Sequence, residues 1–186
     1  MPRAGLDRQA VIDAACSLAD RDGLDAVTLA RLARDLKVKA PSLYNHVGGL
    51  ADIQRELTLR GIREANARMS KAAVGLARKD ALIALGRAYR QFALDHPGLY
   101  NASIRAVPGN DEELALASRD VLETVLAVLS GYGLEDEEAL HATRGLRAII
   151  QGFVSLESAG GFGMPIDTEE SLVRLLSVFA EGLGRT

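Results

Sequence analysis

The chain has 186 residues, of which 48% are hydrophobic and 25% are charged, and its formal net charge is −3. This apolar content excludes global disorder and suffices for one buried core, or for a small head on a larger body. The single cysteine, Cys16, excludes an internal disulfide and a cysteine-based zinc site. No apolar stretch reaches the roughly 20 residues of a membrane span, and the N-terminus lacks the apolar run of a signal peptide. We therefore expect a cytoplasmic protein that does not enter a membrane.

The charge is unevenly distributed along the sequence. Residues 1–80 hold 14 Lys or Arg against 10 Asp or Glu, whereas the remainder holds 8 against 15. A basic end on an acidic body is typical of a protein that contacts a polyanion with one end only. An accidental gradient is the alternative, which charge alone does not exclude.

Apolar residues recur at spacings of three and four along almost the whole sequence, and no segment alternates convincingly with period two. This pattern predicts an all-α fold. The first expected helix runs from an N-cap at Asp7 to Asp22, and Thr28 caps a second one that ends near Leu36. A third, short helix opens at Pro41, whose missing N–H costs nothing in a first helical turn.

The remainder of the sequence predicts a longer helical body. After Gly48-Gly49, a long helix is expected to reach about Gly75. Further helices are expected over about 78–96, 111–130, 136–158 and 168–183, with a short helix or turn over 97–107. The total is about nine helices, which we divide into an N-terminal three-helix head over 1–49 and a body over 50–186.

Two short helices joined by a tight turn and braced by a preceding helix form a helix-turn-helix, the second helix of which lies in the DNA major groove. If Leu43 and Val47 face inward, the outer face presents Ser42 and Asn45 to base edges and Ala40 or Pro41 to a thymine methyl. Hydroxyl, imidazole and ammonium groups, together with backbone N–H groups at helix starts, can contact phosphates. The predicted DNA contacts are Thr28, Lys37, Lys39, Ala40, Pro41, Ser42, Tyr44, Asn45, His46 and Gly49. An ordinary helical hairpin with a polar outer face is the alternative.

The segment TLARLARDLKVKAPSLYNHV, residues 28–47, resembles the DNA-binding head of TetR/AcrR-type transcriptional regulators. The similar elements are the Thr28 cap, Leu32-Ala33, Leu36, Val38, Pro41, Leu43-Tyr44 and His46-Val47. The resemblance implies a homodimer with two heads that bind double-stranded operator DNA, and a helical body that binds a small molecule. Gly48, Gly49 and Leu50 stand where many members carry a phosphate-contacting lysine, so backbone amides would serve here instead.

The body resembles a subgroup of the same family whose C-terminal domains carry a Trp-His-Gly type motif. The similar segments are PGLYNASIRA at 97–106 and the stretch from Leu146 to Leu176. Gln151-Gly152 stands where the subgroup has His-Gly, and the sequence contains no tryptophan. The resemblance therefore implies no role for a histidine at this position.

Aromatic residues concentrate in the body of a chain that is otherwise poor in them, which predicts a mostly apolar effector pocket between about 76 and 163. The expected pocket residues are Tyr89, Phe92, Tyr100, Gln151 and Phe153, although each aromatic could instead belong to the core. Arg90, Gln151 or Ser155 could supply polar groups. Because the sequence shows no cluster of buried charges, we expect a small, largely apolar or aromatic effector.

The helices expected at 136–158 and 168–183 are apolar over more than one face. A helix with such wide apolar cover needs two partners, and we expect these to be its own core and a second subunit. The expected dimer-interface residues are Ile150, Val173, Leu176, Phe179 and Ala180. A monomer in which both helices are fully buried is the alternative.

The sequence gives no sign of catalytic or metal chemistry. His46, His96 and His141 are far apart, and GGFG at 160–163 follows a helix and lacks the pattern of a phosphate-binding loop. We therefore predict a ligand-responsive transcriptional regulator, a repressor released from DNA by its effector, with no cofactor, no metal and no enzyme activity. The alternative is a small all-α ligand carrier or enzyme whose helical hairpin does not bind DNA.

Overall fold

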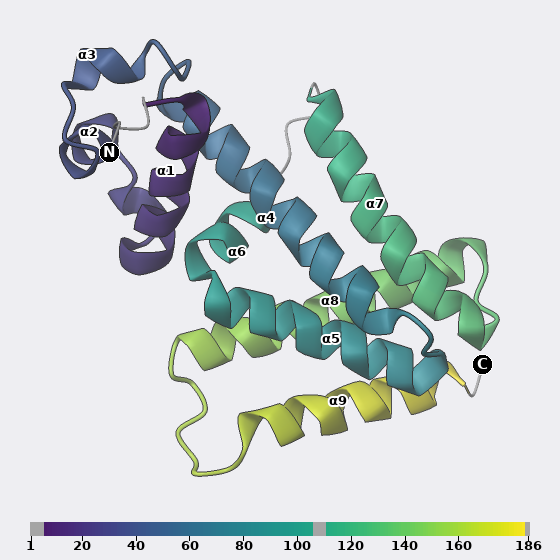
Figure 1. The fold of residues 1–186 in the computed structure, drawn as a ribbon. Coiled ribbons are helices and arrows are strands. Elements are labelled where there is room, and N and C mark those ends of the chain that lie inside the picture. The colour runs from purple at the N-terminus through teal and green to yellow at the C-terminus, as the bar shows by residue number, and fades with distance from the viewer. Residues whose placement is uncertain (1–5, 106–110, 185–186) are drawn as a thin grey trace. The chain divides into compact units, whose positions relative to one another are not determined.

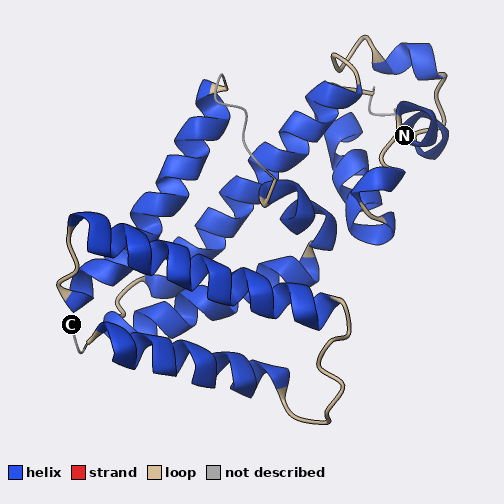
Figure 2. Ribbon diagram, turned by 180° about the vertical axis from the view of Figure 1, so that it is seen from behind, coloured by secondary structure: helices blue, strands red, loops and turns tan. Residues whose placement is uncertain are grey.

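A computed structural model describes residues 6–105 and 111–184 of the chain (Figure 1). Helices joined by loops make up these residues, and no strand occurs among them (Figure 2). The helices are α1 (Arg8–Asp22), α2 (Leu29–Asp35), α3 (Ala40–Leu43), α4 (Leu50–Ala73), α5 (Arg78–Asp95), α6 (Pro97–Ser103), α7 (Glu112–Leu129), α8 (Asp136–Ser158) and α9 (Thr168–Leu183). The predicted all-α fold and its order of helices are therefore confirmed.

Helix starts follow the capping residues of the sequence. The Asp7 carboxylate accepts the N–H of Ala10 at 2.7 Å, and the Thr28 hydroxyl accepts that of Arg31 at 3.2 Å. Asp111 and Asp167 cap α7 and α9 in the same way. Each cap satisfies a backbone donor that has no partner inside its helix, and this is why the starts were predictable from sequence.

The described chain forms two compact units. The first unit combines Met1–Ile62 with His96–Ala115, and the second combines Arg63–Asp95 with Leu116–Thr186. The first unit thus contains more than a three-helix head, because it adds the beginning of α4, α6 and the first turn of α7. The proposed functional boundary at residue 49 remains a prediction.

In the first unit, the start of α6 contacts the end of α1 through hydrogen bonds. The Asp20 carboxylate of α1 accepts the N–H groups of Gly98 and Leu99 at 2.9 and 3.1 Å and contacts Nδ1 of His96 at 2.9 Å. It therefore acts as an N-cap supplied by another helix. The fully buried side chains of this unit include Ile12, Leu18, Leu32, Leu43, Ile53 and Leu57.

In the second unit, α5 packs against both α8 and α9. A Cβ added to Gly86 of α5 would lie 2.4 Å from the Cδ1 atom of Leu176, so glycine permits the close approach of α5 and α9. Fully buried side chains here include Leu82, Leu85, Phe92, Leu129, Leu146 and Leu172. Across the described residues of both units, no helix combines the length and apolarity that crossing a membrane requires.

Candidate DNA-binding interface

The turn between α2 and α3 has the hydrogen bonds of a Schellman motif. The N–H of Val38 donates to the carbonyl of Ala33 at 2.9 Å, and the N–H of Lys37 donates to that of Arg34 at 3.1 Å. Lys37 is left-handed, with φ of 57°, at the position where glycine is most common. A lysine therefore adopts the left-handed conformation of this tight turn, and the sequence contains no glycine that would have indicated it.

The segment after this turn has one buried and one outer side. Leu43 and Val47 are buried, as predicted, whereas Tyr44 is 61% exposed. The side chains of Ser42, Tyr44 and Asn45 form no hydrogen bond within the described part of the chain. These polar groups are therefore free to bind an external partner.

The other predicted contacts differ in accessibility. Lys37, Lys39 and Pro41 are exposed, and Ala40 and His46 are half-buried. Thr28 is exposed, and its hydroxyl is occupied by capping α2. Apart from Thr28, these candidates lie within residues 37–46, between the end of α2 and the start of α4.

At the start of α4, one of the amides predicted to contact phosphate is already engaged within the chain. The Gly48 N–H already donates to the Asp52 carboxylate at 2.8 Å. Gly49 is buried and has φ of 108°, a conformation that favours glycine, and its contact with DNA stays a prediction. A carboxylate of the chain itself therefore occupies the place where a phosphate would accept from Gly48.

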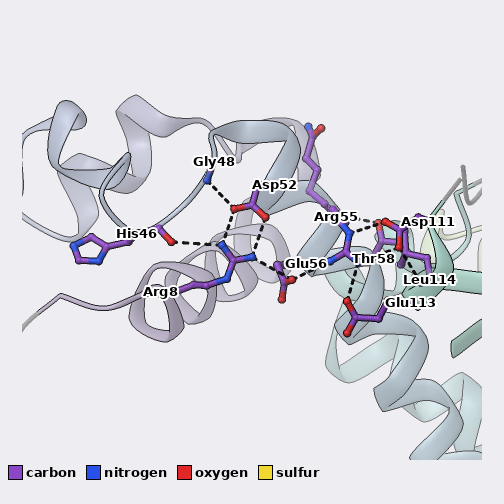
Figure 3. A network of polar contacts seen from close by, with 11 residues as sticks. Arg8, His46, Gly48, Asp52, Arg55, Glu56, Thr58, Asp111, Glu113 and Leu114 are labelled. Atoms are coloured by element: carbon purple, nitrogen blue, oxygen red, sulfur yellow. Dashed lines mark hydrogen bonds and ion pairs between the residues drawn. The ribbon is translucent and has the colours of Figure 1, made fainter. Parts of the chain in front are cut away.

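The same carboxylate is held by an arginine that sequence reasoning missed (Figure 3). Arg8, at the start of α1, donates to both oxygens of Asp52 at 2.6 and 2.8 Å, and it also reaches the His46 carbonyl at 3.4 Å. The bidentate pair with Arg8 lowers the pKa of Asp52 to about 2. An Asp two residues into a helix signals a cap, but nothing in the sequence indicates its partner 44 residues away.

The predicted effector-site residues come together only in part. Nε2 of Gln151 donates to the Tyr89 hydroxyl at 3.3 Å, and the rings of Tyr89 and Phe92 lie 6.4 Å apart. Phe153 packs against Phe162, with 4.8 Å between ring centroids. Tyr100 belongs to the first compact unit and the other four to the second. Burial raises the pKa of the Tyr89 phenol, so this hydroxyl stays protonated and able to hydrogen-bond.

The expectation of no buried charge cluster is wrong. Arg90 of α5 forms a bidentate pair with Glu157 of α8 and also contacts Glu169 and Thr168 of α9. The side chains of Arg90 and Glu157 are only 10% and 13% exposed. The hydrogen bonds from Arg90 lower the pKa of Glu157. Arg90 is therefore engaged in joining three helices and is not a free polar group for a ligand.

The predicted dimer-interface residues also need correction. Ile150, Leu176 and Ala180 are buried within the single chain, so they have almost no surface left for a partner. Val173 and Phe179 are half-buried, and a Cβ on Gly145 of α8 would lie 3.2 Å from the Phe179 ring. The large apolar side chains of α8 and α9 that are exposed are instead Leu140, Leu156, Leu175 and Val178. Three of the five predicted interface residues thus belong to the core of the single chain, and the dimer interface itself stays a prediction.

An all-helical chain with a helix-turn-helix and an outer face of unengaged polar side chains belongs to the class of helix-turn-helix regulators. Residues 82–179 match the model of the tetracyclin repressor-like C-terminal domain. The chain is also 36% identical over 182 residues to YobS of Bacillus subtilis (strain 168), described as an uncharacterized HTH-type transcriptional regulator, and the match covers 98% of this chain and 95% of YobS. The chain belongs to the TetR family of transcriptional regulators.

Solved structures share the fold. A protein of unknown function from Rhodococcus sp. RHA1 matches with a TM-score of 0.84 at 20% identity, over 98% of this chain and 97% of that one. The Streptomyces coelicolor TetR family protein ActR, solved in complex with (S)-DNPA, matches with a TM-score of 0.67 at 21% identity, over 98% of each chain. Among the residues described here, no group of three or more His, Cys, Asp or Glu side chains could hold a metal ion.

Proposed function

We propose that this TetR-family regulator is a cytoplasmic repressor that binds a near-palindromic operator as a homodimer and leaves it when a small, mostly apolar effector binds. The outer face of residues 37–46 carries the proposal. It combines exposed lysines with Ser42, Tyr44 and Asn45, whose polar groups have no partner within the described residues. The Trp-His-Gly type subgroup remains a prediction.

DNA binding is tested by selecting duplexes from a random pool with the wild-type protein. Substitution of Ser42 or Asn45 should change base preference by roughly 1–3 kcal/mol for each good contact. Tyr44→Phe should weaken binding about equally on all sequences, because phosphates carry no sequence information. The absence of any salt-dependent binding to a duplex would exclude the DNA-binding function.

A substitution at Lys37 can separate the effect of charge on DNA binding from effects on the stability of the fold. Lys37→Gly removes the charge and places the residue best suited to a left-handed conformation at that turn. The variant should keep its thermal stability while the salt dependence of DNA binding falls by about one phosphate contact. Lys71→Gln is the matched control, because Lys71 is an exposed lysine near the other end of α4, outside the helix-turn-helix.

We place the effector site in the second unit around Tyr89 and Gln151. Their hydrogen-bonded pair lies beside Phe92, which gives a few polar groups among apolar ones, as ligand sites require. That ActR was solved with (S)-DNPA supports a small-molecule effector for this fold. Tyr100 is left out, because it belongs to the first unit.

Release would be a shift in population between two conformations. An effector that binds better when the two heads are splayed lowers the fraction of protein that can bind the operator. This shift cannot exceed the difference in the effector's affinity for the two conformations. The helix α4 contributes residues to both compact units, so it is the proposed connection.

A compound screen tests the effector site. A true effector should raise the melting temperature and release operator DNA at the same concentrations. Gln151→Trp should weaken both effects, because the indole fills space beside Tyr89. Gln91→Trp adds the same bulk on the exposed side of α5 and is the control. If both effects survive Gln151→Trp, the site lies elsewhere.

A further inference from the structure

The segment expected to read DNA has little support of its own. The helix α3 contains only four residues, followed by a turn to the start of α4. Two buried side chains, Leu43 and Val47, anchor its inner side. A short segment held mainly by two apolar anchors can tilt, and a shift of its downstream end would displace every side chain on the outer face.

That downstream end is held by polar contacts from two other helices (Figure 3). The His46 carbonyl accepts from Arg8 of α1 at 3.4 Å, and the Gly48 N–H donates to Asp52 of α4 at 2.8 Å. Arg8 and Asp52 bind each other through two hydrogen bonds of 2.6 and 2.8 Å. Both contacts to the turn therefore come from the two members of one ion pair, Arg8 and Asp52.

We propose that Arg8 and Asp52 are positioning residues for DNA readout: the pair joins α1 and α4 and fixes the turn that follows the recognition helix. This inference rests on the proposed DNA-binding function. It assigns a role to two residues that lie outside the helix-turn-helix and carry no base contact themselves.

The charges around Arg8 favour positioning over direct contact with DNA. Its guanidinium lies between two carboxylates, Asp52 and Glu56, the latter at 3.2 Å. The positive charge is thus compensated locally and offers little attraction to a phosphate. A bidentate arginine–carboxylate pair also fixes orientation, which a single point charge does not.

The test compares two duplexes. One is selected from a random pool by the wild-type protein, and the other is a scrambled duplex of equal length and composition. Arg8→Gln and Asp52→Asn should each weaken binding to the selected duplex by roughly five- to a hundredfold, the equivalent of misplacing one base contact. The affinity for the scrambled duplex should change far less, and only through the single charge that each substitution removes, falling in Arg8→Gln and rising in Asp52→Asn. Arg8→Lys should recover only part of the loss, because it keeps the charge but not the bidentate geometry.

Arg60→Gln is the matched control. Arg60 also joins α4 to α1, through Asp13 at 2.5 Å, but it has no contact with the turn after α3 among the interactions described for it. This variant should retain the wild-type ratio of selected to scrambled affinity. Amide hydrogen exchange gives a readout without DNA: the Gly48 N–H should exchange faster in Arg8→Gln and keep its wild-type rate in Arg60→Gln.

Three results would overturn the inference. Equal losses on both duplexes, with the salt dependence reduced by about one phosphate, would make Arg8 a direct DNA contact. An equal loss of specificity in Arg60→Gln would show that the effect of Arg8→Gln comes from general destabilisation and not from positioning of the turn. Wild-type affinities and wild-type Gly48 exchange in Arg8→Gln would show that the pair positions nothing. If the wild-type protein selects no duplex at all, the proposed function fails first, which is distinct from these outcomes.

Discussion

Gly98 of α6 lies against Ala19 of α1 so closely that a Cβ on Gly98 would stand 2.2 Å from the Ala19 carbonyl carbon. The two helices approach backbone to backbone, and Asp20 fixes the approach by accepting the N–H groups of Gly98 and Leu99. Any side chain at Gly98 would have to push α6 away from α1 and stretch these hydrogen bonds. Glycine at this position is therefore required by packing.

The first prediction follows from this contact. Gly98→Ala should destabilise the protein by roughly 1–3 kcal/mol, the usual cost of overpacking a rigid contact. Gly182→Ala is the control, because Gly182 lies near the end of α9 with no atom within 4 Å of an added Cβ. The control should be neutral or slightly stabilised. Urea unfolding of both variants measures the difference, and equal stabilities would show that α6 moves away at no cost.

The helix-turn-helix was predictable because its determinants are local. Capping by Thr28, the apolar spacing of Leu32, Leu43 and Val47, and the position of Pro41 each act within a few residues. The same holds for the start of α9 at Asp167, where the carboxylate binds the next turn. A single sequence contains these signals in full.

The errors concern contacts between distant segments. Arg8 and Asp52 are 44 residues apart, and Arg90 and Glu157 are 67 apart. Charge spacing along a helix cannot indicate such partners, because only the packing of several helices brings them together. The misplaced interface residues have a related cause: a helix with two apolar faces does not reveal which face its own core covers, and α5 covers the face that contains Leu176.

The second prediction concerns the buried pair of Arg90 and Glu157. Arg90→Leu leaves the Glu157 carboxylate buried without its main partner, which should destabilise the protein by roughly 3–5 kcal/mol. Arg87→Gln is the control, because Arg87 contacts the same Glu169 but from an exposed position and should contribute only about 0–1 kcal/mol. Chemical unfolding at neutral pH measures both.

A double variant separates the destabilisation caused by an unpaired Glu157 carboxylate from that caused by the lost hydrogen bonds. Replacing both partners, as in Arg90→Leu with Glu157→Leu, should recover much of the stability, because no unpaired charge remains. A double variant as unstable as Arg90→Leu alone would mean that the lost hydrogen bonds to Thr168 and Glu169, and not the unpaired carboxylate, dominate.

The third prediction is the acid sensitivity contributed by Asp52. Its pKa is lowered from 3.8 to about 2 in the folded protein. A carboxyl with a lowered folded-state pKa stabilises the protein above its unfolded-state pKa, and this contribution is lost as the pH falls from about 4 towards 2. Asp52→Asn should therefore lose less stability than the wild type between pH 6 and pH 3. Urea unfolding at both pH values measures this, and parallel losses would show that the Arg8 pair does not survive in solution.

The fourth prediction is a dimer built on the outer faces of α8 and α9. On α9, Val178 is 68% exposed and Leu175 lies beside it, three residues earlier. On α8, Leu156 is exposed, and a Cβ on Gly152, one turn earlier on the same side of the helix, would meet open space, which leaves room for a partner helix. Exposed apolar side chains on two neighbouring helices are suited to the apolar centre of an interface between two copies.

Charge placed on this face should separate the subunits. Val178→Asp should yield a folded monomer, because the side chain is exposed in the single chain but its carboxylate would be buried without a partner in the dimer. Val74→Asp is the matched control, since Val74 is 78% exposed and lies just after α4. Ile150→Asp should unfold the protein instead, because Ile150 is buried within the subunit. Light scattering coupled to size exclusion, with circular dichroism for the fold, distinguishes these states. A Val178→Asp protein that stays dimeric would place the interface on another surface.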